Sequence, residues 1–100
     1  MTDLFYVENH KLVINVEEIR KFPSLGRLFA RDTNPKKIQA YKELMLIWFW
    51  CNYKSPYRDY DPYVEKVRKC LKNSGLPPTY NIDKTMIECF KEYEEAQEAF

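Results

Sequence analysis

The stretch NPKKIQAYKELMLIWFWCN, residues 34–52, decides the fold of this chain of 100 residues. Asn34 and Pro35 form a helix-start pattern, because asparagine caps a helix and proline suits its first turn. Apolar residues then recur at helical spacing, and the second half of the stretch is apolar on every side. The pattern predicts a buried central helix that runs to about Asn52. Its expected core stripe consists of Ile38, Tyr41, Met45 and Trp48.

The sequence before this helix predicts a short β-region and then a helix start. Two β-prone runs, Leu4–Val7 and Leu12–Ile14, flank a turn sequence, so residues 1–14 are expected to form a β-hairpin or an arm. Asn15 is followed three residues later by Glu18, which is the spacing of a capping box at a helix N-terminus. The helical body is therefore expected to begin at residue 15.

Pro23 predicts a second short helix ahead of the central one. Proline interrupts a helix that precedes it and suits the first turn of a helix that follows it. The apolar residues that come next keep helical spacing and are expected to be buried. They are Leu25, Leu28 and Phe29.

Asp61 and Pro62 mark the start of a charged helix after the central one. Gly75 suits its left-handed C-cap, and Leu76 is placed to make the hydrophobic contact that accompanies such a cap. The expected buried face consists of Val64, Val67, Cys70 and Leu71, with Lys66, Arg68, Lys69 and Lys72 mostly outward.

A last helix is predicted to begin near Asn81 or Asp83. Its expected apolar stripe consists of Ile82, Met86, Phe90, Tyr93, Gln97 and Phe100, widened by Ile87, Cys89 and Ala96. Its glutamates are expected to face water or a partner; they are Glu88, Glu92, Glu94, Glu95 and Glu98. The sequence thus predicts one mainly α domain over residues 1–100, with about four helices in residues 15–100.

Charge is unevenly distributed along the chain. Residues 1–19 carry a net charge of −3, residues 20–72 carry +8, and residues 73–100 carry −4, for a total of +1. One interpretation is that the charges complement each other within one compact fold. The other is head-to-tail packing, in which the acidic end of one copy lies against the basic middle of the next.

The residue content does not favour an enzyme, a cofactor or a metal site. His10 is the one histidine and lies in a predicted turn, and neither Gly26 nor Gly75 begins a phosphate-binding loop. Three scattered cysteines form no metal-binding pair, and their odd number favours buried, reduced thiols. The longest apolar run, Leu44–Cys51, is far shorter than the roughly 20 residues of a membrane span, so no membrane contact is expected.

A tyrosine-rich segment between the central and charged helices is the candidate interaction site. Residues 53–63 contain four tyrosines and one arginine, the residue types that dominate interface hot spots. The expected interface residues are Tyr53, Lys54, Ser55, Pro56, Tyr57, Arg58 and Tyr60. The alternative is that these tyrosines fold back as a lid over the tryptophan-rich end of the central helix.

The order of motifs resembles a module in structural proteins of large tailed phages, including crAss-like phages. The matching segments lie in residues 15–96, and the most specific is Tyr53-Lys54-Ser55-Pro56-Tyr57. The others are Glu17-Glu18-Ile19, Phe22-Pro23-x-Leu25, Arg31-Asp32, Lys42–Trp48, Val64–Val67 and Lys91–Glu95. The charged helix departs from the pattern, because it lacks the acidic opening expected after the loop.

The resemblance implies a virion protein, assembled in the host cytoplasm, that forms part of an oligomeric ring or connector near the portal or neck. Its partners would be other copies of itself and neighbouring portal or neck proteins. A second hypothesis is a phage nucleic-acid-binding or regulatory module that uses the basic tyrosine-rich loop; direct nucleic-acid contact is less favoured, because an acidic last helix repels phosphate. A third is a small factor that acts against host defence.

Overall fold

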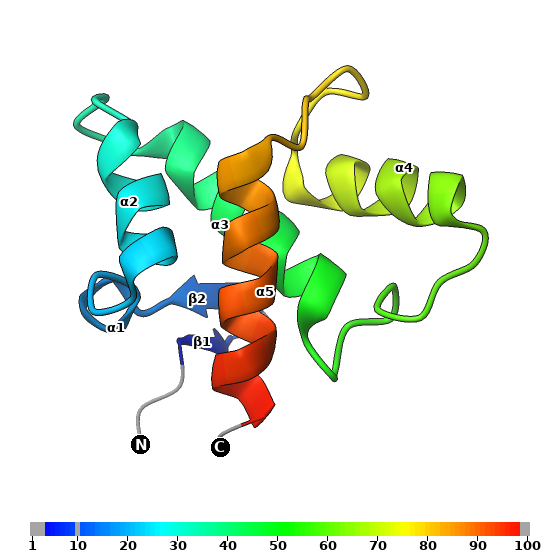
Figure 1. The fold of residues 1–100 in the computed structure, drawn as a ribbon, viewed down its shortest axis with the longest axis horizontal. Helices are drawn as coiled ribbons and strands as arrows, with labels where there is room; N and C mark the ends of the chain where they lie inside the picture. Colours follow the sequence, from blue (N-terminus) through cyan, green and yellow to red (C-terminus); the bar gives the residue numbers. More distant parts are fainter. Residues whose placement is uncertain (1–3, 10, 99–100) are drawn as a thin grey trace.

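The computed structural model describes residues 4–9 and 11–98 and shows a helical protein with an N-terminal β-hairpin (Figure 1). The predicted mainly α fold is confirmed. Helix α3 crosses behind α5 in the middle of the molecule, with α2 on one side and α4 on the other. The described elements are β1 (Phe5–Glu8), β2 (Lys11–Ile14), α1 (Val16–Ile19), α2 (Pro23–Arg31), α3 (Ile38–Cys51), α4 (Tyr63–Ser74) and α5 (Lys84–Glu98).

The first residues form a hairpin that is attached to the helical body. Strands β1 and β2 pair antiparallel, from Phe5 opposite Ile14 to Glu8 opposite Lys11. A two-stranded hairpin is marginal by itself in water, so it needs a supporting surface. Helix α5 supports the hairpin here: the buried Phe5 of β1 packs its ring edge-on against that of Tyr93, with ring centroids 5.3 Å apart. Of the two alternatives for this segment, the hairpin is therefore observed.

Local capping signals set the boundaries of the first two helices. Asn15 accepts a hydrogen bond from the Glu18 N–H, as predicted, although the Glu18 side chain forms an ion pair with Lys21. Pro23 occupies the first turn of α2, and the three predicted core residues of this helix are all buried.

Glu92 was expected to face water or a partner. It instead accepts hydrogen bonds from two backbone N–H groups at the start of α2, those of Ser24 at 3.0 Å and Leu25 at 2.9 Å.

Helix α3 begins at Ile38, three residues later than the start expected at Pro35. Asn34 forms a turn instead, in which its backbone oxygen accepts from the Lys37 N–H and its side chain accepts from the Lys36 N–H. Lys37 then has a positive φ of 53°, so the helix cannot continue back through it. Asp32 takes over the capping role by accepting from the Ala40 N–H at 3.0 Å.

The buried face of α3 differs from the predicted stripe. Ile38 and Tyr41 are 51% and 38% exposed, and Met45 and Trp48 are half-buried, so the expected stripe is wrong. Trp48 packs against the edge of the core and is not enclosed by it. The helix is apolar almost all round, so its periodicity permits several faces, and the positions of α2, α4 and α5 select one. The buried residues are Ala40, Glu43, Leu44, Leu46, Ile47 and Cys51.

Helices α4 and α5 begin close to the predicted positions, and α4 also ends where the sequence indicates. Gly75 ends α4 with a φ of 83°, and the buried Leu76 donates its N–H to the Leu71 carbonyl, which confirms the predicted cap. Asp83 caps α5 through the Met86 N–H at 2.9 Å.

Two predicted core residues on these helices are exposed. Val64 is 72% exposed because α4 packs mainly on α3 and its first turns extend away from the body (Figure 1). Ile87 of α5 is 58% exposed. The predictions for Phe100 and for the Glu98 side chain lie outside what is described.

Candidate interaction surface

The tyrosine-rich segment divides into an inward-facing and an outward-facing set. Inward are Ser55, which is buried, and Tyr57 and Arg58, which are half-buried. Outward and exposed are Tyr53, Lys54, Pro56 and Tyr60. The segment therefore contains both residues that cover the central helix and residues that are exposed to solvent.

Ser55 fixes the shape of this segment. Its hydroxyl donates to the Phe49 carbonyl near the end of α3 at 2.5 Å and accepts from the Tyr57 N–H at 3.2 Å. A serine hydroxyl that bonds to backbone two residues on stabilises a turn in place of a helix. Pro56, which follows, disfavours the helical conformation at Ser55. Together these two residues keep the chain from resuming a helix after α3, which ends at Cys51.

Tyr57 and Arg58 form the lid. The Tyr57 ring contacts Phe49, with ring centroids 6.0 Å apart, and belongs to the set of residues packed against the core. Arg58 donates from Nε to the Cys51 carbonyl at 3.1 Å and lies 4.3 Å above the Tyr53 ring. The last carbonyls of a helix lack helical donors, so this contact satisfies one of them. Both side chains thus hold the segment onto α3.

Lys66 joins the lid to α4, although it was expected to point mostly outward. Its ammonium group donates to the Arg58 carbonyl at 2.7 Å and lies 4.3 Å from the centre of the Trp50 ring. The Trp50 ring stacks on Phe90 of α5 at 5.2 Å and meets Tyr63 edge-on. This contact removes one lysine from the basic outer surface.

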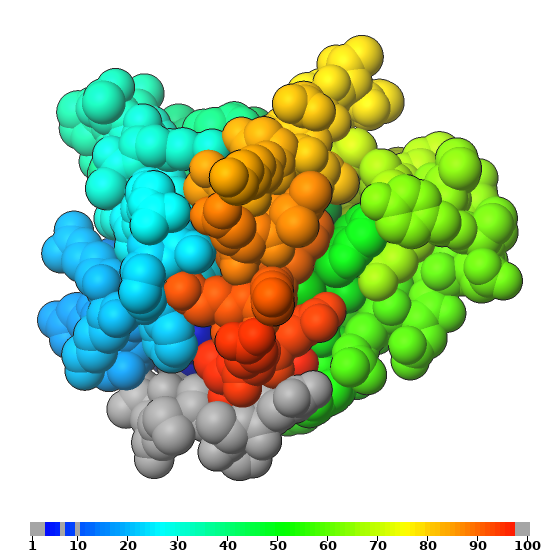
Figure 2. Space-filling view, viewed as in Figure 1, coloured from blue at the N-terminus to red at the C-terminus, as the bar shows by residue number. Residues whose placement is uncertain are grey.

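The exposed side chains continue from the loop onto α4. Tyr53 and Tyr60 are 52% and 38% exposed, and Tyr63 and Val64 are 66% and 72% exposed. A groove of about 340 Å³ runs along this side of α4, and the surface is hollowed beside this helix in Figure 2. Its lining residues are Tyr63, Val64, Val67, Arg68, Leu71 and Pro78. The helical spacing of Val64 predicted a core position for this residue, so the groove was not expected from the sequence.

The two sets of loop residues are expected to respond differently to substitution. Replacing Tyr57 and Arg58 together by alanine should lower the melting temperature by about 4–8 °C, which corresponds to a loss of about 1 kcal/mol in a domain of this size. Replacing the exposed Tyr53 and Tyr60 by alanine is expected to shift it by less than about 2 °C. Thermal unfolding followed by circular dichroism measures both. Equal shifts would contradict the division into lid and surface.

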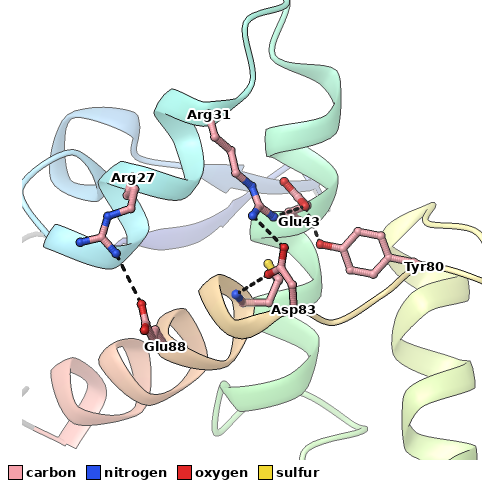
Figure 3. Close-up of polar contacts among 7 residues, drawn as sticks. Arg27, Arg31, Glu43, Tyr80, Asp83 and Glu88 are labelled. Atoms are coloured by element: carbon pink, nitrogen blue, oxygen red, sulfur yellow. Dashed lines mark hydrogen bonds and ion pairs between the residues drawn. The ribbon is translucent and has the colours of Figure 1, made fainter.

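A second feature is a polar cluster that joins α2, α3, the loop after α4 and the start of α5 (Figure 3). Glu43 is 3% exposed on the otherwise apolar α3. It accepts from the Arg31 guanidinium at 2.7 Å and from the Tyr80 hydroxyl at 2.5 Å. Arg31 also pairs with Asp83 at 2.9 Å. A buried carboxylate is tolerated only when it is paired and hydrogen-bonded, and both conditions are met here.

This cluster raises the pKa of two of its members, Tyr80 and Arg31. Burial, together with the hydrogen bond to the Glu43 carboxylate, raises the pKa of Tyr80, so the hydroxyl remains a donor. Burial opposes the charge on Arg31, but its two carboxylate partners raise its pKa further. Nearby, Arg27 of α2 pairs with Glu88 of α5. Part of the basic middle is therefore neutralised by the acidic end of the same chain, as the compact-fold interpretation of the charge pattern expects.

Asp83 makes acid stability testable. Burial favours its neutral form, but the Met86 N–H and Arg31 stabilise the carboxylate, and the net effect lowers the pKa of Asp83 below its ordinary value. A lowered pKa contributes stability above about pH 4, and this stability is lost as the pH falls through the folded-state value. Between about pH 5 and pH 2, the Asp83→Asn variant should lose stability less steeply than the parent in urea titrations. Identical pH slopes would contradict this role.

The three cysteines are buried, free thiols, as the sequence predicts. Burial raises the pKa of Cys70 to about 11 and that of Cys89 to about 12, and it raises the pKa of Cys51 as well. We expect no rapid labelling of the folded protein by a thiol reagent at pH 8, and three reactive thiols after denaturation, because the thiolate is the reactive form. Rapid labelling in the native state, or fewer than three thiols in denaturant, would contradict this.

In residues 4–9 and 11–98, the structure contains no cluster of three or more side chains of the types that ligate metals. Within the same part of the chain, no helix combines the length and apolar character of a membrane span. No family model matches the sequence, and neither a curated protein nor a solved structure matches it significantly.

Proposed function

We propose that this protein is a structural component of a tailed-phage virion and acts through protein–protein contacts in an oligomeric ring or connector near the portal. The observation that carries the proposal is the exposed aromatic surface of Tyr53, Tyr60 and Tyr63. Their segment is held onto α3 by the hydrogen bonds of Ser55 and Arg58 to backbone carbonyls of that helix. Because the segment is held in place before binding, little ordering entropy is lost when a partner docks. The assignment to a phage rests on the resemblance of residues 15–96 to virion proteins of large tailed phages.

The nucleic-acid alternative receives less support from the geometry. Arg58 of the tyrosine-rich segment and Lys66 of α4 are engaged in hydrogen bonds inside the chain. Tyr57 is half-buried, so its face is not free for a base. A protein that tracks a phosphate backbone needs its cations at the surface, and here two of them stabilise the lid.

The test is quantitative mass spectrometry of particles purified from the phage that encodes this chain. The proposal expects several copies per particle and chemical cross-links from Lys54 to another virion protein or another copy. Replacing Tyr53 and Tyr60 by serine should strongly reduce incorporation. The matched control is Tyr41→Ser, because Tyr41 is 38% exposed, like Tyr60, but lies on α3 away from the loop. Absence of the chain from particles, with salt-sensitive DNA binding instead, would favour the nucleic-acid alternative.

A further inference from the structure

We propose that the groove side of α4 is a self-complementary surface on which α4 of a second copy packs antiparallel. This inference goes beyond the proposed function, because a two-fold contact between copies differs from the head-to-tail contacts that close a ring. It requires only the residues of α4 and of the turn before it.

The apolar part of this surface has the spacing of a helix-pairing stripe. Val64, Val67 and Leu71 follow one another in α4 at intervals of three and four residues, and Tyr60 lies in the turn before the helix. Such intervals keep side chains on one side of a helix and allow a second helix to pack along them. Leu71 is buried by α3, whereas Val64 is 72% exposed and Tyr60 is 38% exposed. The stripe therefore begins open to solvent and enters the core only in the last turns of α4.

A charged stripe runs beside the apolar one and changes sign along its length. Asp61, just before the helix, and Glu65 are acidic, whereas Arg68 and Lys72 are basic. Each of these four charged residues directly follows, in the sequence, one of the apolar residues named above. The side chains of Glu65 and Arg68 are 38% and 53% exposed and form an ion pair within the helix. Lys66, which would disturb the acidic half, is turned away toward Trp50.

This arrangement identifies the occupant as another copy of α4. In an antiparallel pair of identical helices, a flanking stripe faces the same stripe of the partner in reverse order. Asp61 and Glu65, around the start of α4 in one copy, then lie beside Lys72 and Arg68, toward the end of α4 in the other copy. The apolar residues of the two helices pack between these charges. A parallel pair would place like charges together and is disfavoured. A small-molecule ligand fits less well, because the groove is at the low end of ligand-pocket volumes and lacks several convergent polar groups.

The contact is expected to be weak and reversible. Helix α4 has 12 residues and is therefore about 18 Å long, so it offers less area than the roughly 800 Å² per partner of a stable interface. We expect the purified full chain to be monomeric at low micromolar concentration and to dimerise with a Kd on the order of 100 μM. Sedimentation equilibrium from about 5 μM to 1 mM measures this.

Two kinds of variants test the surface. Val64→Asp should weaken dimerisation at least tenfold, whereas the matched control Ile87→Asp, at an apolar residue of α5 that is 58% exposed, should leave it unchanged. Melting temperatures identify any variant that fails to fold. For the charges, Asp61→Lys with Glu65→Lys should abolish self-association, as should Arg68→Glu with Lys72→Glu, and an equimolar mixture of the two double variants should restore a dimer.

Three outcomes would overturn the inference. The first is a parent protein that remains monomeric at 1 mM. The second is equal weakening by Val64→Asp and Ile87→Asp, which would place the contact elsewhere. The third is a mixture of the charge variants that fails to associate. None of these results depends on whether the chain is found in virions, so this inference and the proposed function can fail separately.

Discussion

Replacing Arg31 with methionine is expected to destabilise the folded protein by about 3 kcal/mol at pH 7. Methionine keeps the apolar length of the side chain but leaves the Glu43 carboxylate, which is 3% exposed, without its cation. Breaking one side of a buried ion pair costs about 3–5 kcal/mol, and the partial exposure of Arg31 places the expected value at the low end. Urea denaturation followed by tryptophan fluorescence measures the change.

Arg27→Met is the matched control for this prediction. Arg27 lies on the same helix and pairs with Glu88 at 3.4 Å, but both side chains are well exposed to solvent. Exposed pairs contribute less than about 1 kcal/mol, so this variant should unfold close to the parent. Adding Glu43→Gln to Arg31→Met should recover much of the loss, because glutamine removes the buried charge and still offers Tyr80 an acceptor. Equal effects of Arg31→Met and Arg27→Met would contradict the burial of Glu43.

Leu44→Ala is expected to cost about 2–5 kcal/mol, because Leu44 is fully buried on the face of α3 that meets the core. Much of the total stability of a small domain would be lost, since such domains are stable by about 5–15 kcal/mol. The control is Ile38→Ala on the same helix. Ile38 is 51% exposed, so its truncation should change the stability by less than about 1 kcal/mol.

This comparison decides which face of α3 is buried. If Ile38→Ala were the more damaging substitution, the stripe predicted from the sequence would be correct and the observed packing wrong.

Trp48 offers a further check. It is half-buried, so Trp48→Ala should cost less than the 3–5 kcal/mol typical of an enclosed tryptophan. Equilibrium unfolding in urea is suitable for all three variants, with circular dichroism as the signal because Trp48 is itself a fluorophore.

Only part of the candidate surface could be predicted from the sequence. The enrichment of tyrosine identified residues 53–63, and Ser55-Pro56 indicated a stop after α3, which is observed. Residue type does not show which tyrosines point outward. Tyr57 is drawn inward by Phe49, whereas Tyr53 remains exposed although both lie in the same short segment. One available signal was missed, since the acidic Glu43 within an apolar helix indicates a buried polar partner.

The sequence by itself determined the helix boundaries set by short-range chemistry. Asn15, Pro23 and Gly75 act through hydrogen bonds or backbone angles within a few residues, and all three end or begin helices as predicted. Only the tertiary structure decided which face of each helix is covered. Glu92 caps α2 from 67 and 68 residues away, and Val64 is exposed because α4 extends past the body. Helical periodicity specifies that a face is apolar, whereas burial depends on which distant element packs against it.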